Sequence, residues 1–201
     1  MALTQETELC DAMLQAWYPG QAGGEAIAKT LFGEYNPAGR LPLTFYRSTS
    51  QLPDFEDYSL KGRTYRYFKG TPLFHFGHGL SYTNFEYGNA RLSAPSIKAG
   101  ETLTVTIPVS NIGARDGEEV VQVYLRRPGD KEGPSHALRG FKRVAIAKGN
   151  TTDVEIALSP EDFEWFDTET NTMRQLEGEY EILYGGTSDV NKLKKTSITI
   201  E

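Results

Sequence analysis

The 201-residue sequence predicts a mainly β fold: a fibronectin type III-like or immunoglobulin-like antiparallel β-sandwich, preceded by a partial α/β segment. Three observations support the sandwich. Short alternating apolar and polar runs recur after residue 82, clusters of turn residues separate them, and no convincing helical period lies among them. An irregular β-barrel is the alternative fold for this part of the chain.

The first 51 residues predict a strand, a helix and a second strand. Residues 12–17 form a short apolar run that reads as a buried strand. A helix is expected over residues 23–33, because Glu25 lies in its first turn and apolar residues recur at helical spacing. Residues 41–45 then alternate as a strand, and Pro42 favours a sheet edge. One such unit cannot cover both faces of a sheet, so residues 1–51 predict the remnant of a larger domain.

The second part, residues 82–201, predicts about seven short strands. The clearest runs are 102–109, 120–125, 138–146, 154–158, 180–184 and a last one around Ile198 and Ile200. An acidic cluster beside Trp165 resembles a sugar site in composition, but it also suits the start of an exposed strand. We expect the second interpretation, with Phe163 and Trp165 turned inward.

Residues 52–81 connect the two parts and are rich in aromatic side chains. Flexible linkers are poor in such residues, so this connection is expected to pack against its neighbours, and we place the boundary near Ser81. The aromatic residues here are Phe55, Tyr58, Tyr65, Tyr67, Phe68, Phe74 and Phe76, followed by Tyr82.

Composition excludes several classes of function. The net charge of −6 argues against nucleic-acid binding, which needs a basic surface. No apolar run approaches the roughly 20 residues of a membrane span, and no export signal is visible in this sequence. A single cysteine, Cys10, cannot form an internal disulfide.

Local motifs for cofactors and metals are weak. The glycines of residues 20–24 precede a helix, yet no Walker lysine follows them and Glu25 would repel a phosphate. His75 and His78 flank Gly77 in a loop, so neither a metal nor a cofactor is expected. His136 is expected to be solvated in a hairpin loop.

Motifs spread over nearly the whole chain give the strongest functional signal. They are WYPGQAGGEAIA at 17–28, LFGEYNPAGRLP at 31–42, GRTYRYF at 62–68, PLFHFGHGLSY at 72–82, NIG at 111–113, GEEVVQVY at 117–124 and LRGFKRV at 138–144. In this order the chain resembles glycoside hydrolase family 3. The motifs are similar to the end of that family's second, α/β-sandwich domain, the connection after it, and a C-terminal fibronectin type III-like domain. His75 and His78 depart from the pattern, where Pro and Tyr are expected.

The resemblance implies a retaining exo-β-glycosidase that acts on β-linked glucosides or xylosides, with an Asp nucleophile and a second-domain acid/base, commonly Glu. Both catalytic residues would lie upstream of residue 17, so no residue of this chain is assigned to catalysis. The chain is therefore expected to be an inactive C-terminal fragment whose partners are the upstream catalytic domains. Parent enzymes are often periplasmic or secreted, and the compartment of this chain stays open.

Tyr65, Tyr67 and Phe68 in the connection are the candidate substrate contacts, at the edge of a pocket built by the upstream domains. The alternative function is an independent module that binds carbohydrate or protein through the β-sandwich.

Overall fold

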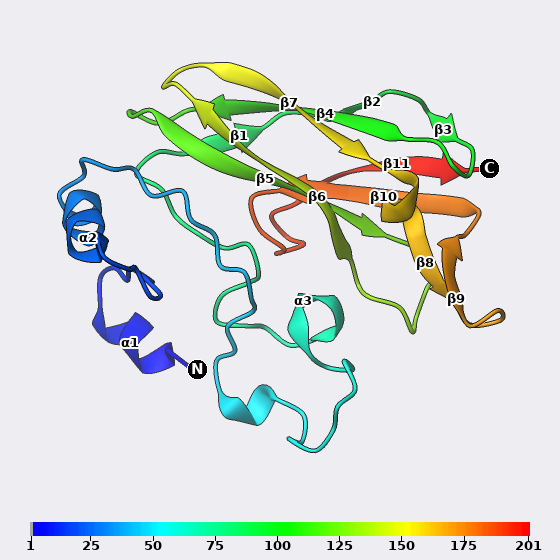
Figure 1. Cartoon of the computed structure of the whole chain (residues 1–201), viewed down its shortest axis with the longest axis horizontal. Helices are drawn as coiled ribbons and strands as arrows, with labels where there is room; N and C mark the ends of the chain where they lie inside the picture. Colours follow the sequence, from blue (N-terminus) through cyan, green and yellow to red (C-terminus); the bar gives the residue numbers. More distant parts are fainter. Residues whose placement is uncertain (1) are drawn as a thin grey trace.

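A computed structural model describes residues 2–201 as a β-sandwich with an irregular N-terminal segment lying along one end and one outer face (Figure 1). One sheet has four strands in the order β1-β4-β2, with β7 also paired to β4. Their bounds are β1 Phe85–Tyr87, β2 Arg91–Leu92, β4 Leu103–Asn111 and β7 Thr151–Leu158. The pairing of β4 with β7 is the longest in this sheet and runs antiparallel from Leu103–Leu158 to Ser110–Thr151.

The second sheet has five strands in the order β3-β11-β10-β5-β6. Only the short β3–β11 pair is parallel. The bounds are β3 Ser96–Ile97, β5 Gly117–Arg126, β6 Ala137–Ile146, β10 Gly178–Gly185 and β11 Lys194–Ile200. A small hairpin, β8 Glu164–Asp167 with β9 Thr172–Gln175, follows the 3₁₀ turn η2 Pro160–Phe163. The mainly β prediction and the sandwich are confirmed, and each strand run listed for residues 82–201 coincides with an observed strand.

Four strands escaped the sequence analysis: β1, β2, β3 and β9. None exceeds four residues, which is too short for alternation to be recognised. β1 and β2 are held by pairing to β4, β3 by pairing to β11, and β9 by pairing to β8. The strand expected to start beside Trp165 is β8. The expectation that Phe163 and Trp165 turn inward is confirmed, since their exposed fractions are 0% and 2%.

The core lies between the two sheets and follows the period of two predicted for half-buried strands. Leu103, Val105, Ile107 and Val109 of β4 have no exposed surface, and the intervening residues are only partly buried. They belong to the same cluster as Val121 and its neighbours on β5 across the sandwich. Close-packed apolar contact of this kind supplies most of the stability of such a domain.

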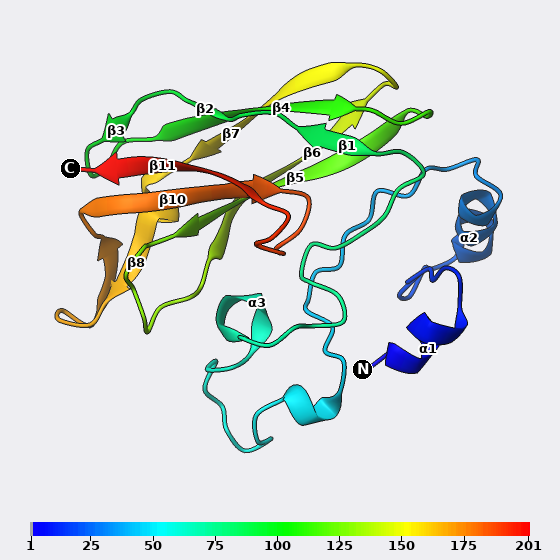
Figure 2. The same cartoon turned by 180° about the vertical axis from the view of Figure 1, so that it is seen from behind.

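Strand β5 is buried on both of its faces. Val121, Val123 and Leu125 point into the core, while Gln122 and Tyr124 point to the opposite face and are also buried. The connection segment covers this second face, as the ribbon beneath the sheet shows in Figure 2. The sandwich therefore needs the connection to complete the burial of its central strand.

The N-terminal part contains four short helical elements: α1 Thr4–Leu9, α2 Gly23–Leu31, η1 Thr49–Gln51 and α3 Thr64–Tyr67. The helix predicted from residue 23 is confirmed and ends before Gly33, which has a φ of +76° suited to glycine. None of the helices within residues 2–201 is long and apolar enough to cross a membrane.

The predictions of strands on either side of that helix, at residues 12–17 and 41–45, were wrong. Residues 12–17 are irregular and mostly exposed, because no strand among the described residues lies beside them to accept their backbone hydrogen bonds. Residues 41–45 make only an isolated antiparallel bridge, between Phe45 and Phe74. Pro42 donates no backbone hydrogen bond, and the facing segment turns at Gly77, so a regular ladder cannot extend.

The packing of the connection is uneven. Phe74 and Phe76 are partly buried against neighbouring segments, as expected for an aromatic-rich connection. Phe55 and Tyr58, in contrast, are each 91% exposed. The expectation of a packed connection therefore holds for its second half and fails for residues 52–60.

We predict that Leu103→Ala lowers the free energy of unfolding by about 2–5 kcal/mol, because it leaves a cavity in the fully buried core. The matched variant Leu80→Ala, at a position that is 77% exposed, should change it by less than about 0.5 kcal/mol. Urea unfolding of the two variants measures the difference. Equal losses would contradict the assignment of the core.

Candidate functional site

A buried ion pair joins the N-terminal segment to the sandwich. The Arg40 Nη2 atom lies 3.0 Å from both carboxylate oxygens of Glu119 on β5. The two side chains are 9% and 6% exposed. A charge removed from water in this way depends on its partner, so the pair fixes the position of Arg40 against the sandwich.

Glu119 is buried because of its place in the strand alternation. Its side chain points to the same face of β5 as those of Val121 and Val123, but it lies near the start of the strand, where the apolar core stops. The side chain of Tyr87 on β1 lies close to it, and burial, followed by the charge of Glu119, raises the pKa of the Tyr87 hydroxyl well above its usual range. The junction is thus polar at its centre and enclosed by both sheets.

Two N-terminal segments pair with each other beside this ion pair. The Leu41 amide donates to the His78 carbonyl at 2.9 Å, and the Gly77 amide donates to the Leu41 carbonyl at 2.7 Å. Gly77 has a φ of +77°, and a Cβ there would lie 2.1 Å from the Gln122 Oε1 atom. Only glycine fits this turn, which brings residues 72–79 into contact with β5.

Tyr65, the first sequence-predicted substrate contact, lies against the outer face of β5. Its ring stacks on Phe76 at a centroid distance of 4.5 Å and meets Tyr124 edge to face at 5.8 Å. Its hydroxyl accepts a hydrogen bond from the Leu138 amide at 3.0 Å. The observed contacts of Tyr65 therefore anchor α3 to β5 and β6.

Phe68 and Tyr67, the other two candidates, lie at the end of α3. The Phe68 ring meets Tyr46 edge to face at 5.0 Å, and the Tyr46 hydroxyl accepts from the Thr64 amide at 2.8 Å. Tyr67 is half-buried. The three candidates are thus close in sequence, but Tyr65 and Phe68 pack against different neighbours and do not form one shared aromatic surface.

His136 is buried, so the expectation that it would be solvated was wrong. It is 3% exposed and lies beside the rings of Tyr65 and Tyr124, at centroid distances of 5.3 and 5.1 Å. Its Nδ1 atom is 2.9 Å from the Ser135 hydroxyl. Burial lowers the pKa of His136 to about 4, so the ring is neutral near neutral pH. The connection covers the hairpin loop that looked exposed in sequence.

The two other histidines face separate partners. His75 Nε2 is 3.8 Å from the Asp189 carboxylate, whereas the His78 ring stacks on Phe74 at a centroid distance of 5.1 Å. Burial is the first cause of a lowered pKa at both. Within residues 2–201 no group of three metal-binding side chains lies together.

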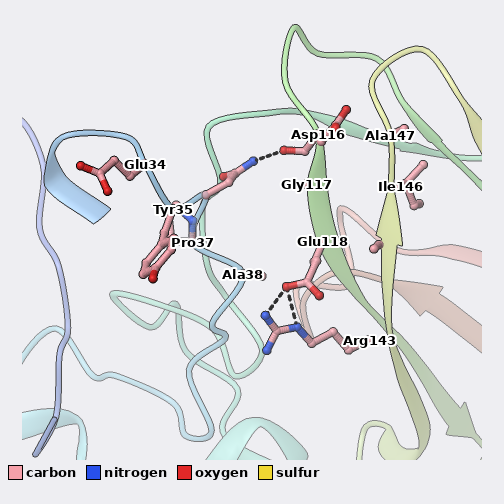
Figure 3. Close-up of a pocket in the computed structure, with 12 residues that line it drawn as sticks. Glu34, Tyr35, Pro37, Ala38, Asp116, Gly117, Glu118, Arg143, Ile146 and Ala147 are labelled. Carbon is pink, nitrogen blue, oxygen red and sulfur yellow. Dashed lines mark hydrogen bonds and ion pairs between the residues drawn. The ribbon is translucent and has the colours of Figure 1, made fainter. Parts of the chain in front are cut away.

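A groove of about 720 Å³ lies where residues 34–38 face β5 and β6 (Figure 3). The Asn36 amide bridges it by donating to the Asp116 carbonyl at 2.8 Å, and Glu118 is ion-paired with Arg143 on the other side. The carboxylate of Asp116 accepts the Lys148 amide at 2.8 Å. These polar groups already hold the loop and the strands together, so the groove is a feature of the junction itself.

Sequence reasoning missed the Arg40–Glu119 pair. Two signals single out its members: Arg40 stands within the 31–42 motif, and Glu119 continues the inward alternation of β5. Neither signal indicates that the two side chains meet, because 78 residues separate them along the chain.

We predict that Arg40→Met or Glu119→Gln alone lowers the free energy of unfolding by about 3–5 kcal/mol, because a buried polar group or charge loses its partner. The double variant should lose less than the sum of the two. Arg91→Met is the matched control, since its pair with Asp153 is 59% and 52% exposed and is worth less than about 1 kcal/mol. If Arg40→Met costs no more than this control in urea unfolding, the pair does not hold the junction.

We also predict a pH effect from His136. Its pKa is about 4 when folded and about 6.5 when unfolded, so the unfolded state binds its proton first as the pH falls. Stability should therefore decrease between pH 6.5 and pH 4, by up to about 3 kcal/mol from this group. His136→Gln should flatten that part of a stability–pH curve. His75→Gln is measured alongside for comparison. If His136→Gln leaves the slope of the stability–pH curve between pH 6.5 and pH 4 unchanged, the prediction is contradicted.

Comparisons with known proteins identify the family of the chain. The family model of the glycosyl hydrolase family 3 C-terminal domain matches residues 1–82, and the model of the fibronectin type III-like domain matches residues 119–188. A xylan 1,4-beta-xylosidase from Xylanibacter ruminicola is 53% identical over 200 residues, which is 100% of this chain and 23% of that protein. A periplasmic beta-glucosidase from Salmonella typhimurium is 36% identical over 80% of this chain and 23% of its own length.

Solved structures agree with the fold. A β-glucosidase from Erythrobacter marinus has a TM-score of 0.82 and 38% identity, covering 97% of this chain and 26% of that one. A beta-glucosidase from Listeria innocua has a TM-score of 0.83 and 27% identity, over 100% and 29% of the two chains. The chain thus spans about a quarter of the length of these relatives. It belongs to glycosyl hydrolase family 3, as a C-terminal part that ends in a fibronectin type III-like domain.

Proposed function

We propose that this chain is the non-catalytic C-terminal portion of a retaining exo-β-glycosidase that acts on β-linked glucosides or xylosides. The observation that carries the proposal is the match to relatives named as xylosidases and glucosidases over all or most of this chain, but over only about a quarter of their length. The remaining three quarters would carry the catalytic residues. The fibronectin type III-like domain would then stabilise those upstream catalytic domains.

The junction supports this structural role. Arg40 and its neighbours at the end of the α/β segment are held against the sandwich by an ion pair that is almost fully buried. Because this contact holds the N-terminal segment in place against the sandwich, a domain that packs on the segment is stabilised as well. We therefore propose the division into residues 1–51, the connection 52–81, and the sandwich 82–201.

Exposed apolar side chains on the N-terminal segment indicate where upstream partners would pack. Tyr18 is 100% exposed, and Leu31 and Phe32 at the end of α2 are 65% and 86% exposed. Such side chains at one end of a domain are typical of a surface that is covered in the complete protein. The rest of the α/β domain is the partner that this surface fits.

Of the three candidate substrate contacts Tyr65, Tyr67 and Phe68, we propose Tyr67 as the preferred one. The rings of Tyr65 and Phe68 are already engaged with neighbours in this chain, which supports a structural role for them. The alternative function, an independent binding module, receives less support, because its strand aromatics Tyr124 and Trp165 are buried.

We predict that the purified chain leaves nitrophenyl β-xyloside and β-glucoside intact. A chimera in which this chain replaces the matching C-terminal 200 residues of the Xylanibacter ruminicola enzyme should hydrolyse a nitrophenyl β-xyloside within about tenfold of the intact enzyme. The same enzyme truncated before those residues should lose its activity. Turnover by the chain alone, or an inactive chimera, would contradict the proposal.

The binding-module alternative is checked separately by affinity-gel electrophoresis of the chain on soluble xylans and glucans. Retardation that survives competition with an unrelated protein would favour the module.

A further inference from the structure

An ordered loop in the connection, residues 53–62, exposes three large apolar side chains. We call it the aromatic loop. Phe55 and Tyr58 are each 91% exposed, and Leu60 is 57% exposed. No other phenylalanine within the described residues is exposed to this degree. The loop lies at the far end of the molecule from the sandwich in both views (Figures 1 and 2).

The conformation of the aromatic loop is fixed without any help from its rings. The Arg63 guanidinium donates to the carbonyl oxygens of Asp54, Asp57 and Ser59, at 2.8, 2.6 and 3.2 Å. The carboxylate of Asp54 accepts the Glu56 amide at 3.0 Å, and that of Asp57 accepts the Ser59 amide. The two rings are therefore held out toward solvent by a preformed backbone.

Rings held in this way are suited to contact with another protein surface. A preordered aromatic side chain loses little conformational freedom on binding and buries a large apolar area. Aromatic residues of this kind are enriched among the few side chains that dominate binding at interfaces. The aromatic loop thus has the properties of a docking element.

The position of the aromatic loop indicates its partner. The start of the described chain, at α1, lies on the same side of the molecule as the loop in both views. The Thr4 hydroxyl donates to the Arg47 carbonyl at 2.7 Å, which ties that start to the segment leading into the loop. The relatives are about four times longer than this chain, so an upstream polypeptide would enter beside the loop.

The charges of the aromatic loop define the surface that would receive it. Asp54, Glu56 and Asp57 flank the two rings, and Lys61 lies further along. A complementary surface would therefore be an apolar recess with basic side chains at its rim.

We infer that the aromatic loop docks, through Phe55 and Tyr58, on the upstream catalytic part of the parent enzyme. This inference rests on the proposed function, because it takes the upstream part of the same polypeptide as the partner. It adds a second point of attachment, separate from the exposed residues of α2.

Limited proteolysis of the chain and of the active chimera described above tests the inference. Chymotrypsin cleaves after aromatic residues, so it should cut after Phe55 and Tyr58 in the isolated chain. In the chimera these cuts should be at least about tenfold slower, because docking must open before cleavage. Cleavage after Phe166 of β8, a 51% exposed position on the sandwich, is the internal control and should keep its rate.

A double variant, Phe55→Ser with Tyr58→Ser, provides the second measurement. It should lower the thermal inactivation midpoint of the chimera by about 4 °C or more and leave the midpoint of the isolated chain unchanged. Phe166→Ser is the matched control and should leave the difference between the two proteins unaltered.

The outcomes separate the two proposals. An active chimera whose aromatic loop is cut as fast as in the isolated chain, and whose midpoint is insensitive to the double variant, overturns the docking inference alone. An inactive unaltered chimera overturns the proposed function and the inference with it.

Discussion

The buried pair between Arg40 and Glu119 is the constraint on which the arrangement of the chain depends. It joins residues from the α/β segment and from β5 that lie 79 positions apart in sequence. A charged group at 9% or 6% exposure is unfavourable without its partner. The N-terminal segment therefore has one well-defined position against the sandwich, and the turn at Gly77 follows from that position.

Strand β5 explains why the connection is part of the folded unit. Its inner face contributes Val121 and Val123 to the core, and its outer face carries Gln122 and Tyr124, which are buried by the connection. Tyr65 and Phe76 supply that cover, and His136 becomes neutral and buried beneath it. Removing the connection would expose polar and aromatic side chains that are now enclosed.

These features suit a part whose task is to stabilise other domains. The sandwich supplies a large apolar core, and the junction couples it firmly to the α/β segment. The most exposed apolar residues, among them Tyr18, Phe32, Phe55 and Tyr58, lie outside the sandwich, in the N-terminal segment and the aromatic loop. A β-sandwich that stabilises a neighbouring catalytic unit needs both a core that is buried within the sandwich and an exposed apolar surface that the neighbouring unit can cover.

The sequence by itself determined the sandwich, the helix from residue 23 and the family, because alternation and local motifs are recorded in neighbouring residues. It predicted strands at 12–17 and 41–45 that do not form, since a strand also requires a partner that no local pattern reveals. Only the tertiary structure decided the burial of His136 and the pairing of Arg40 with Glu119. Both outcomes depend on segments that are distant in the sequence, because the burial of a side chain is set by whichever residues pack against it in the folded protein.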